Sequence, residues 1–302
     1  MPAFLKDLRH LRLLQELRKL NRRRARSSKL AGTWYAGTRK SLISQIESLF
    51  TGPLGPGSVP KLAEKSDSRL LALISPHAGY MYSGQAAAWG FWEAAKYGPR
   101  NTIIIIGPNH RGIGSPVSAS SVDIWSTPLG ESELDIELTK MIAKRSGVLD
   151  LDESAHELEH SIEIQLPFIQ YLYGTAKIVS IVSYASDLGL SMELGKAISD
   201  VVKGKDVLII ASSDMTHYLP HDDVSKRDAE TLAAIISLDE RSIWAKATRL
   251  ESLCGLDGVV ATISAAKSLG GKEAKVLCHY TSGDVTGDKS SVVGYASVAI
   301  YA

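Results

Sequence analysis

Two kinds of apolar pattern alternate along most of this chain. Short continuous apolar runs, typical of strands that are buried on both faces, end at loops rich in Gly and Pro. Longer segments between them carry apolar residues at three- and four-residue spacing, which is the pattern of amphipathic helices. The strongest strand signal is the run of four isoleucines within 102–106, because a strand that is apolar on both faces belongs in the middle of a parallel sheet.

The same patterns predict the order of the main elements. Strands are expected at 69–75, 102–106, 177–184, 206–213, 275–280 and 292–301. Helices are expected at 38–50, 83–97 with Gly98 as C-cap, from Ser132 with a capping box, 161–173 with a kink at Pro167, 190–201, 225–236 and 258–269. Such alternation over most of the chain predicts an α/β fold in one large domain, with a central mixed or largely parallel sheet and helices on both faces.

Composition narrows the function classes. The chain of 302 residues is 44% hydrophobic and 22% charged, which excludes a mostly disordered chain. Two cysteines exclude a disulfide framework and fit a reducing compartment, so a cytoplasmic location is expected. No uninterrupted apolar stretch has the ~18 residues that a membrane span needs. A net charge of +1 argues against nucleic acid as a specific partner.

Although the net charge of the whole chain is close to zero, its N-terminal arm is strongly basic. Residues 1–29 contain ten Lys or Arg and two acidic residues, so the arm carries +8 and the remainder −7. Leucines at nearly helical spacing would let the arm form a basic amphipathic helix that contacts an acidic surface. The alternative is a solvated, partly disordered extension. The folded α/β domain is expected at 30–302.

Histidines follow three of the predicted strands. His77, His110 and His217 each lie just beyond a strand, in loops that also carry Gly, Pro or Asp. Ligands of open α/β sheets bind beyond the carboxyl ends of the strands, so these loops are expected to share one site. Cys254 directly precedes the helix predicted at 258–269, where the helix dipole favours a thiolate. Imidazole and thiolate together are suitable ligands for a borderline or soft metal ion.

A second histidine pattern competes with this site. Residues 156–160 form a His-Glu-x-x-His string, which on a helix would be a zinc protease motif. Because the next helix is predicted to begin after the second histidine, we expect His156 and Glu157 in a surface loop and no zinc protease site. Glu163 and His160 are expected to form hydrogen bonds beside the main site. Cys278 falls within a predicted strand and is expected in the core.

A set of ordered motifs carries a resemblance to a known family. The motifs lie at 30–35, 75–80, 107–110, 122–129, 159–163, 212–214, His217 and 254–255. On these motifs, from about residue 30 onward, the chain resembles the Memo family, proteins named for a role in cell motility. The resemblance implies a fold similar to that of the extradiol ring-cleaving dioxygenases, with His77, His110 and Cys254 as metal ligands. It also implies that Asp214 and His217 line the same pocket, His217 as the acid–base residue, and that Trp34 contacts the ligand.

The third ligand departs from the dioxygenase pattern. Those enzymes hold iron with two histidines and a carboxylate, whereas Cys254 supplies a thiolate, which favours softer ions. The expectations are therefore one metal ion, iron or copper with zinc as an alternative, in a redox protein, an extradiol-type dioxygenase or a non-enzymatic binding module. A small molecule or peptide is the expected occupant of the cleft, walled by Trp34 and Tyr80. His217 is the expected general acid–base, oriented by Asp214.

Overall fold

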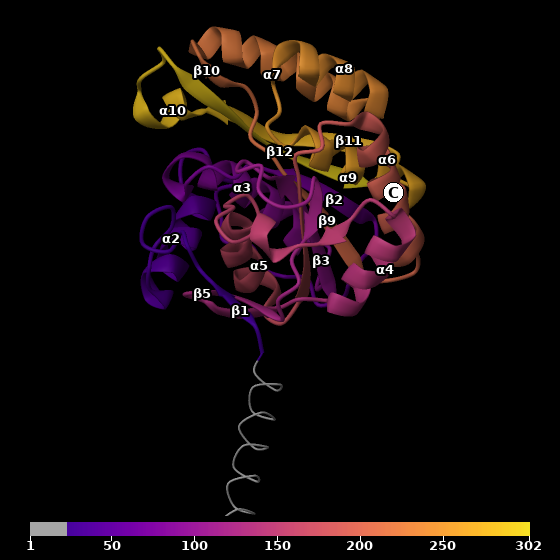
Figure 1. Ribbon diagram of the computed structural model, residues 1–302. Coiled ribbons are helices and arrows are strands. Elements are labelled where there is room, and N and C mark those ends of the chain that lie inside the picture. The colour runs from indigo at the N-terminus through magenta and orange to yellow at the C-terminus, as the bar shows by residue number, and fades with distance from the viewer. Residues whose placement is uncertain (1–22) are drawn as a thin grey trace, which may run out of the picture.

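The computed structural model describes residues 23–302, and its centre is a nine-stranded mixed sheet (Figure 1). The strands lie in the order β10 (His217–Leu219), β12 (Val292–Tyr301), β2 (Leu70–Ser75), β9 (Val207–Ser212), β3 (Thr102–Pro108), β8 (Lys177–Ser183), β4 (Val117–Ala119) and β7 (Asp150–Leu151), with β11 (Glu273–Thr281) paired to β12. The central strands β2, β9, β3 and β8 are mutually parallel, whereas β12 runs antiparallel to β2 and β4 runs antiparallel to β8. The predicted α/β class with a mixed sheet is confirmed.

The isoleucine run in β3 shows how both faces of the sheet are buried. Ile103 and Ile105 pack in one hydrophobic cluster, and Ile104 and Ile106 pack in another. Because successive side chains of a strand point to opposite faces, the two clusters lie on opposite sides of the sheet. The first face is covered by α2 (Arg39–Thr51), α3 (Tyr80–Ala95) and α5 (Leu166–Tyr173). The second is covered by α4 (Ile136–Ser146), α6 (Leu188–Val202), α7 (His221–Ile236), α8 (Glu240–Leu250) and α9 (Leu256–Ser268) (Figure 1).

Several predicted element ends differ from the structure. Helix α3 begins at Tyr80 rather than at 83, and its C-cap is Lys96 rather than Gly98. Ser132 lies in strand β6 (Gly130–Glu133), so the expected capping box is absent and Asp135 alone caps α4. Pro167 does not kink a helix, because a 3-10 turn, η2 (Glu163–Gln165), precedes α5 and places Pro167 in the first turn, where a missing N–H is tolerated.

The basic arm contributes its last residues to the fold. Strand β1 (Ala25–Ser27) pairs with β5 (Ile124–Thr127), which pairs with β6 in a small three-stranded sheet. Arg26 is buried and donates from Nη1 to Oε2 of Glu163 at 2.6 Å. The fold therefore takes in residues 23–29, which the sequence analysis assigned to the extension. The expectations for residues 1–22 lie outside the described residues.

The remaining short elements are η1 (Glu153–Ala155) and α10 (Ser282–Thr286). None of the helices within residues 23–302 combines the length and the apolar character that a membrane crossing requires.

Candidate metal centre

Three adjacent parallel strands end at the same edge of the sheet. Strand β9 lies between β2 and β3, and all three run in the same direction. His77 follows the end of β2, Asp214 follows β9 and His110 follows β3. The sheet topology therefore brings together three loops that are far apart in the sequence, as the strand-end argument predicts.

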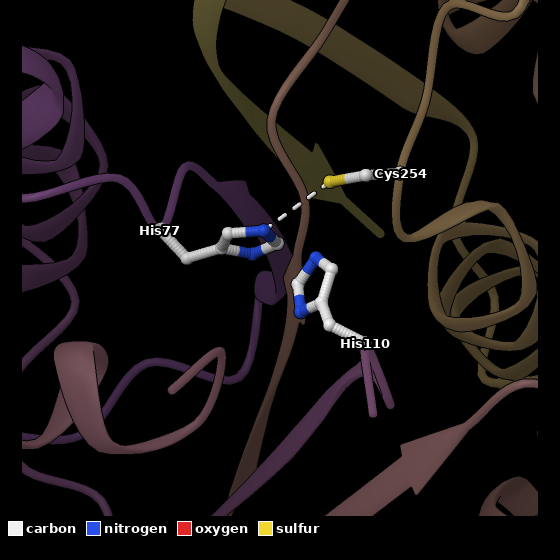
Figure 2. Close-up of side chains that lie close together, drawn as sticks. All are labelled: His77, His110 and Cys254. Carbon is white, nitrogen blue, oxygen red and sulfur yellow. Dashed lines mark hydrogen bonds between the residues drawn. The ribbon is translucent and has the colours of Figure 1, made fainter. Parts of the chain in front are cut away.

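The loop between α8 and α9 adds Cys254 to this edge. Its Sγ lies 3.2 Å from His77 Nε2, and Figure 2 shows the His77, His110 and Cys254 side chains directed toward one another. One ligand atom from each residue lies within 4.8 Å of the other two. Gly255 permits this approach, because a Cβ there would meet the Ser212 carbonyl oxygen at 2.5 Å.

Hydrogen bonds fix the tautomer of His77. Ser212 Oγ donates its only proton to the Ser161 carbonyl at 2.6 Å and accepts from Gln165 Nε2 at 3.0 Å. Ser212 Oγ therefore also accepts from His77 Nδ1, 3.1 Å away, which must carry the proton. The Nε2 lone pair of His77 then faces Cys254. Burial lowers the pKa of His77, so the ring is neutral, as a metal ligand must be.

Glu159 fixes His110 in the same way. His110 Nδ1 donates to Glu159 Oε1 at 2.9 Å, which leaves the Nε2 lone pair free. The carboxylate also accepts from the backbone N–H groups of His110, His160 and Ser161. Burial alone would raise the pKa of Glu159, but the hydrogen bonds that the carboxylate accepts from His110 and from the backbone N–H of Ser161 help to lower it to about 2. His110, Glu159 and His160 form a second group close enough to hold a metal, but Glu159 already accepts four hydrogen bonds, three at Oε1 and one at Oε2.

The donor set of His77, His110 and Cys254 fits a metal ion. Two neutral imidazoles and one thiolate are ligands for zinc, copper or iron. Burial raises the pKa of the Cys254 thiol well above its usual range, and the nearby Asp214 carboxylate raises it further. Burial and Asp214 therefore outweigh the favourable effect on the thiolate that was expected from the start of α9. A cation beside Sγ supplies the charge that ionisation of this buried thiol requires.

A cleft of about 640 Å³, here called the ligand cleft, opens onto these three residues. Trp34 lines it with 37% of its surface exposed, and its ring centroid lies 4.6 Å from that of His160. The His160 ring in turn stacks on His110 at 4.4 Å. Tyr80 is only 2% exposed and donates its hydroxyl proton to the Ile164 carbonyl, so the expectation that it walls the cleft is corrected. Its neighbour Tyr82 lines the cleft instead.

His217 and Asp214 both line the ligand cleft, but Asp214 does not orient the His217 ring as expected. Asp214 Oδ1 accepts the backbone N–H of His77 at 2.7 Å, and its Oδ2 lies 3.9 Å from His77 Nε2. Within residues 23–302 the structure records no hydrogen bond between Asp214 and His217. Burial raises the pKa of Asp214 to about 7 and lowers that of His217. Asp214 therefore positions the loop of His77 rather than the ring of His217.

The His-Glu-x-x-His string is not helical. His156 follows the short turn η1, and residues 157–160 form no helix, so the geometry of a zinc protease is absent there. His156 is 0% exposed, with Nδ1 beside Ser180 Oγ at 3.2 Å, and its expected place in a surface loop is wrong. Glu157 is exposed.

Two residues of this string belong to the site: Glu159, to which the sequence analysis gave no role, and His160, which it expected to form hydrogen bonds beside the site. Glu159 holds His110, and His160 lies between Trp34 and His110. Their only sequence signal was their place in the 159–163 motif. Glu163, expected beside the site, instead binds Arg26, Ser28 and Tyr35 away from the ligand cleft.

The chain is similar to known proteins over most of its length. A family model described as Memo-like protein matches residues 26–299. A MEMO1 family protein of Pyrobaculum aerophilum is 41% identical over 283 residues, covering 92% of this chain and 99% of that protein. One of Sulfurisphaera tokodaii is 43% identical over 275 residues, covering 89% and 96%. A crystal structure of an uncharacterised Escherichia coli protein superposes with a TM-score of 0.53 at 12% identity, covering 76% of this chain and 99% of that one, which shows a shared fold.

Proposed function

The chain belongs to the Memo family, and from this premise we propose that it is a metal-dependent redox protein whose single iron or copper ion is held by His77, His110 and Cys254. The observation that carries the proposal is the set of three ligand atoms, all within 4.8 Å of one another, at the floor of a cleft. Here Ser212 and Glu159 leave both Nε2 atoms free to bind.

Iron or copper bound by these ligands would supply a one-electron centre with room for an exogenous ligand. The protein's own contribution is to hold the two imidazoles in the required tautomer and to keep the thiolate beside them. Trp34, which lines the cleft and is partly exposed, offers its ring to a ligand that enters the cleft. His217 is placed on the cleft wall to take or give a proton there, because its lowered pKa keeps a neutral ring available as a base. The ligand we propose is a small molecule or a peptide.

Metal analysis tests the proposal. The protein is purified without oxygen, loaded with Fe(II) or Cu(I), desalted and measured by inductively coupled plasma mass spectrometry. One equivalent per chain is expected, and His77→Ala, His110→Ala and Cys254→Ala should each lose it. His221→Ala, which changes a histidine outside the ligand cleft, serves as the control and should retain it. Retention of the ion by all three ligand variants would refute the proposal.

A second candidate is an extradiol-type dioxygenase. The aromatic wall of the cleft, formed by Trp34 and Tyr82 beside the candidate ligands, favours this candidate because it suits a flat substrate. The thiolate of Cys254 in place of a carboxylate counts against it. Oxygen uptake by the Fe(II)-loaded protein is measured with a panel of catechols. Uptake that depends on a catechol favours the dioxygenase over the proposed redox protein. Metal binding with neither uptake nor redox cycling would instead indicate a non-enzymatic binding module.

A further inference from the structure

The candidate metal centre lies between two separate hollows. Besides the ligand cleft, a hollow of about 460 Å³ reaches the centre from the side of α8 and α9; we call it the α8–α9 hollow. Among residues 23–302, only His110 and Cys254 line both hollows, so these two residues form the partition between them. The α8–α9 hollow is also lined by Ser183, Ser186, Thr248, Glu251 and Asp257.

The two hollows differ in chemical character. The ligand cleft is walled by large apolar and aromatic side chains, among them Trp34, Met81 and Tyr82. The α8–α9 hollow carries two carboxylates, Glu251 and Asp257, whereas the ligand cleft carries one, Asp214. Among residues 23–302, no Lys or Arg lines either hollow. A hollow lined by charges of one sign concentrates ions of the opposite sign and raises their rate of association.

The two carboxylates occupy different depths. Glu251 is exposed, where it ends α8 in a left-handed conformation with a φ of 51°, and it forms no ion pair within the described part of the chain. Asp257 is half-buried and accepts from Ser183 Oγ at 2.7 Å and from the Ser186 N–H at 3.1 Å. Arg227 donates to the Leu250 carbonyl, next to Glu251 in the chain, and does not line the hollow.

We propose that the α8–α9 hollow is the route by which the metal cation enters and leaves its site, so that metal exchange does not pass through the ligand cleft. The proposal rests on the proposed function, because it assumes that His77, His110 and Cys254 bind a metal. Glu251 draws a hydrated cation to the mouth, and Asp257 lies on its path inward. Cys254 and His110 are the first permanent ligands on this path, and His77 completes the set from the far side.

Stopped-flow binding of Co(II) tests the route. The absorption band of a Co(II)–thiolate bond reports coordination by Cys254 without any assay of activity. Thr248→Trp places a large ring at an exposed position of α8 that lines the hollow. Its control is Arg241→Trp, also exposed on α8 but outside the hollow. Met81→Trp narrows the ligand cleft instead.

The route predicts a change in rate without a change in final occupancy. Thr248→Trp should slow Co(II) association about tenfold, and Glu251→Lys should slow it by a similar factor that shrinks at high salt. Arg241→Trp, Met81→Trp and Glu131→Lys, an exposed acid of β6 outside the hollow, should match the wild type.

Two results would overturn the proposal in distinguishable ways. If the thiolate band forms but only Met81→Trp slows it, or no variant does, the route is wrong and the metal site stands. If no thiolate band forms in the wild type, the proposed function fails and the route fails with it.

Discussion

Glu159 holds His110 at two points, through the ring Nδ1 at 2.9 Å and through the backbone N–H at 2.7 Å. Both the direction of the imidazole and the position of its loop therefore depend on one buried carboxylate. The string that contains Glu159 resembles a zinc protease motif, yet its second glutamate serves a site built mainly from other loops.

Replacing this carboxylate should weaken metal binding. Glu159→Gln places an amide NH₂ where the carboxylate accepts N–H groups, so we expect metal affinity to fall by about 10–100-fold. The matched control is Glu157→Gln, an exposed glutamate of the same string, which should bind like the wild type. Competition titration against a chromophoric zinc chelator measures the zinc affinity of both variants and of the wild type. Equal affinities would contradict the role assigned to Glu159.

His217 should matter for chemistry and not for metal binding. Its side chain lines the ligand cleft but is absent from both groups of residues that could hold a metal. We expect His217→Ala to keep the metal while metal-dependent turnover falls by about 10²–10⁴-fold, the usual contribution of a general acid–base. Metal content and oxygen uptake are measured on the same sample. A loss of metal in proportion to the loss of uptake would make His217 a ligand instead.

The two cysteines should differ in sensitivity to oxidation. Burial raises the pKa of both thiols, so neither is expected to react first because it is more ionised. The order of oxidation should instead depend on how easily peroxide reaches each sulfur. Cys254 lines two hollows, whereas Cys278 lies in β11 against the Ala86 carbonyl. After mild peroxide treatment of metal-free protein, mass spectrometry should find Cys254 oxidised before Cys278. The reverse order would argue against Cys254 as an accessible ligand.

Acid should destabilise the protein through Glu163. Burial would raise the pKa of this carboxyl, but the charge and hydrogen bond of Arg26 outweigh burial and lower it from its ordinary value of 4.5. Because the folded pKa lies below the unfolded one, this stabilisation is present above pH 4.5 and is lost as the pH falls through the folded pKa. Glu163→Gln leaves the Arg26 charge buried, so we expect a loss of about 3–5 kcal/mol at neutral pH and a weaker acid dependence.

Urea unfolding between about pH 7 and pH 3 measures this effect. Glu131→Gln, which changes an exposed carboxylate, is the control and should follow the wild type at every pH. An unchanged free energy of unfolding for Glu163→Gln would show that the Arg26 pair contributes nothing.

The sequence was most informative where a pattern was long and local. The isoleucine run predicted β3 and its burial on both faces, and strand ends predicted that His77 and His110 converge. The sequence was least informative where the position of a residue or strand depends on partners that are far away in the chain. Strand β1 has three residues and no readable periodicity, and it forms only because β5 pairs with it and Glu163 neutralises Arg26.

The same reasoning explains the errors around the site. His156 was expected at the surface because a single sequence does not show which distant side chains, here Trp125 and Ser180, enclose it. Tyr80 was expected in the cleft because it follows a strand end, but α3 begins at that residue and turns its ring toward Phe168.

His77 and Cys254 touch although 177 positions separate them in the chain. A metal bound between them would act as a reversible cross-link that closes a very long loop, and the unfolded chain would lose this closure. Affinity for the ion would then appear as resistance to unfolding, so the protein's lifetime would depend on the supply of metal around it. A chain deprived of its ion would be lost to proteolysis sooner than a loaded one, which would couple the abundance of the protein to metal availability.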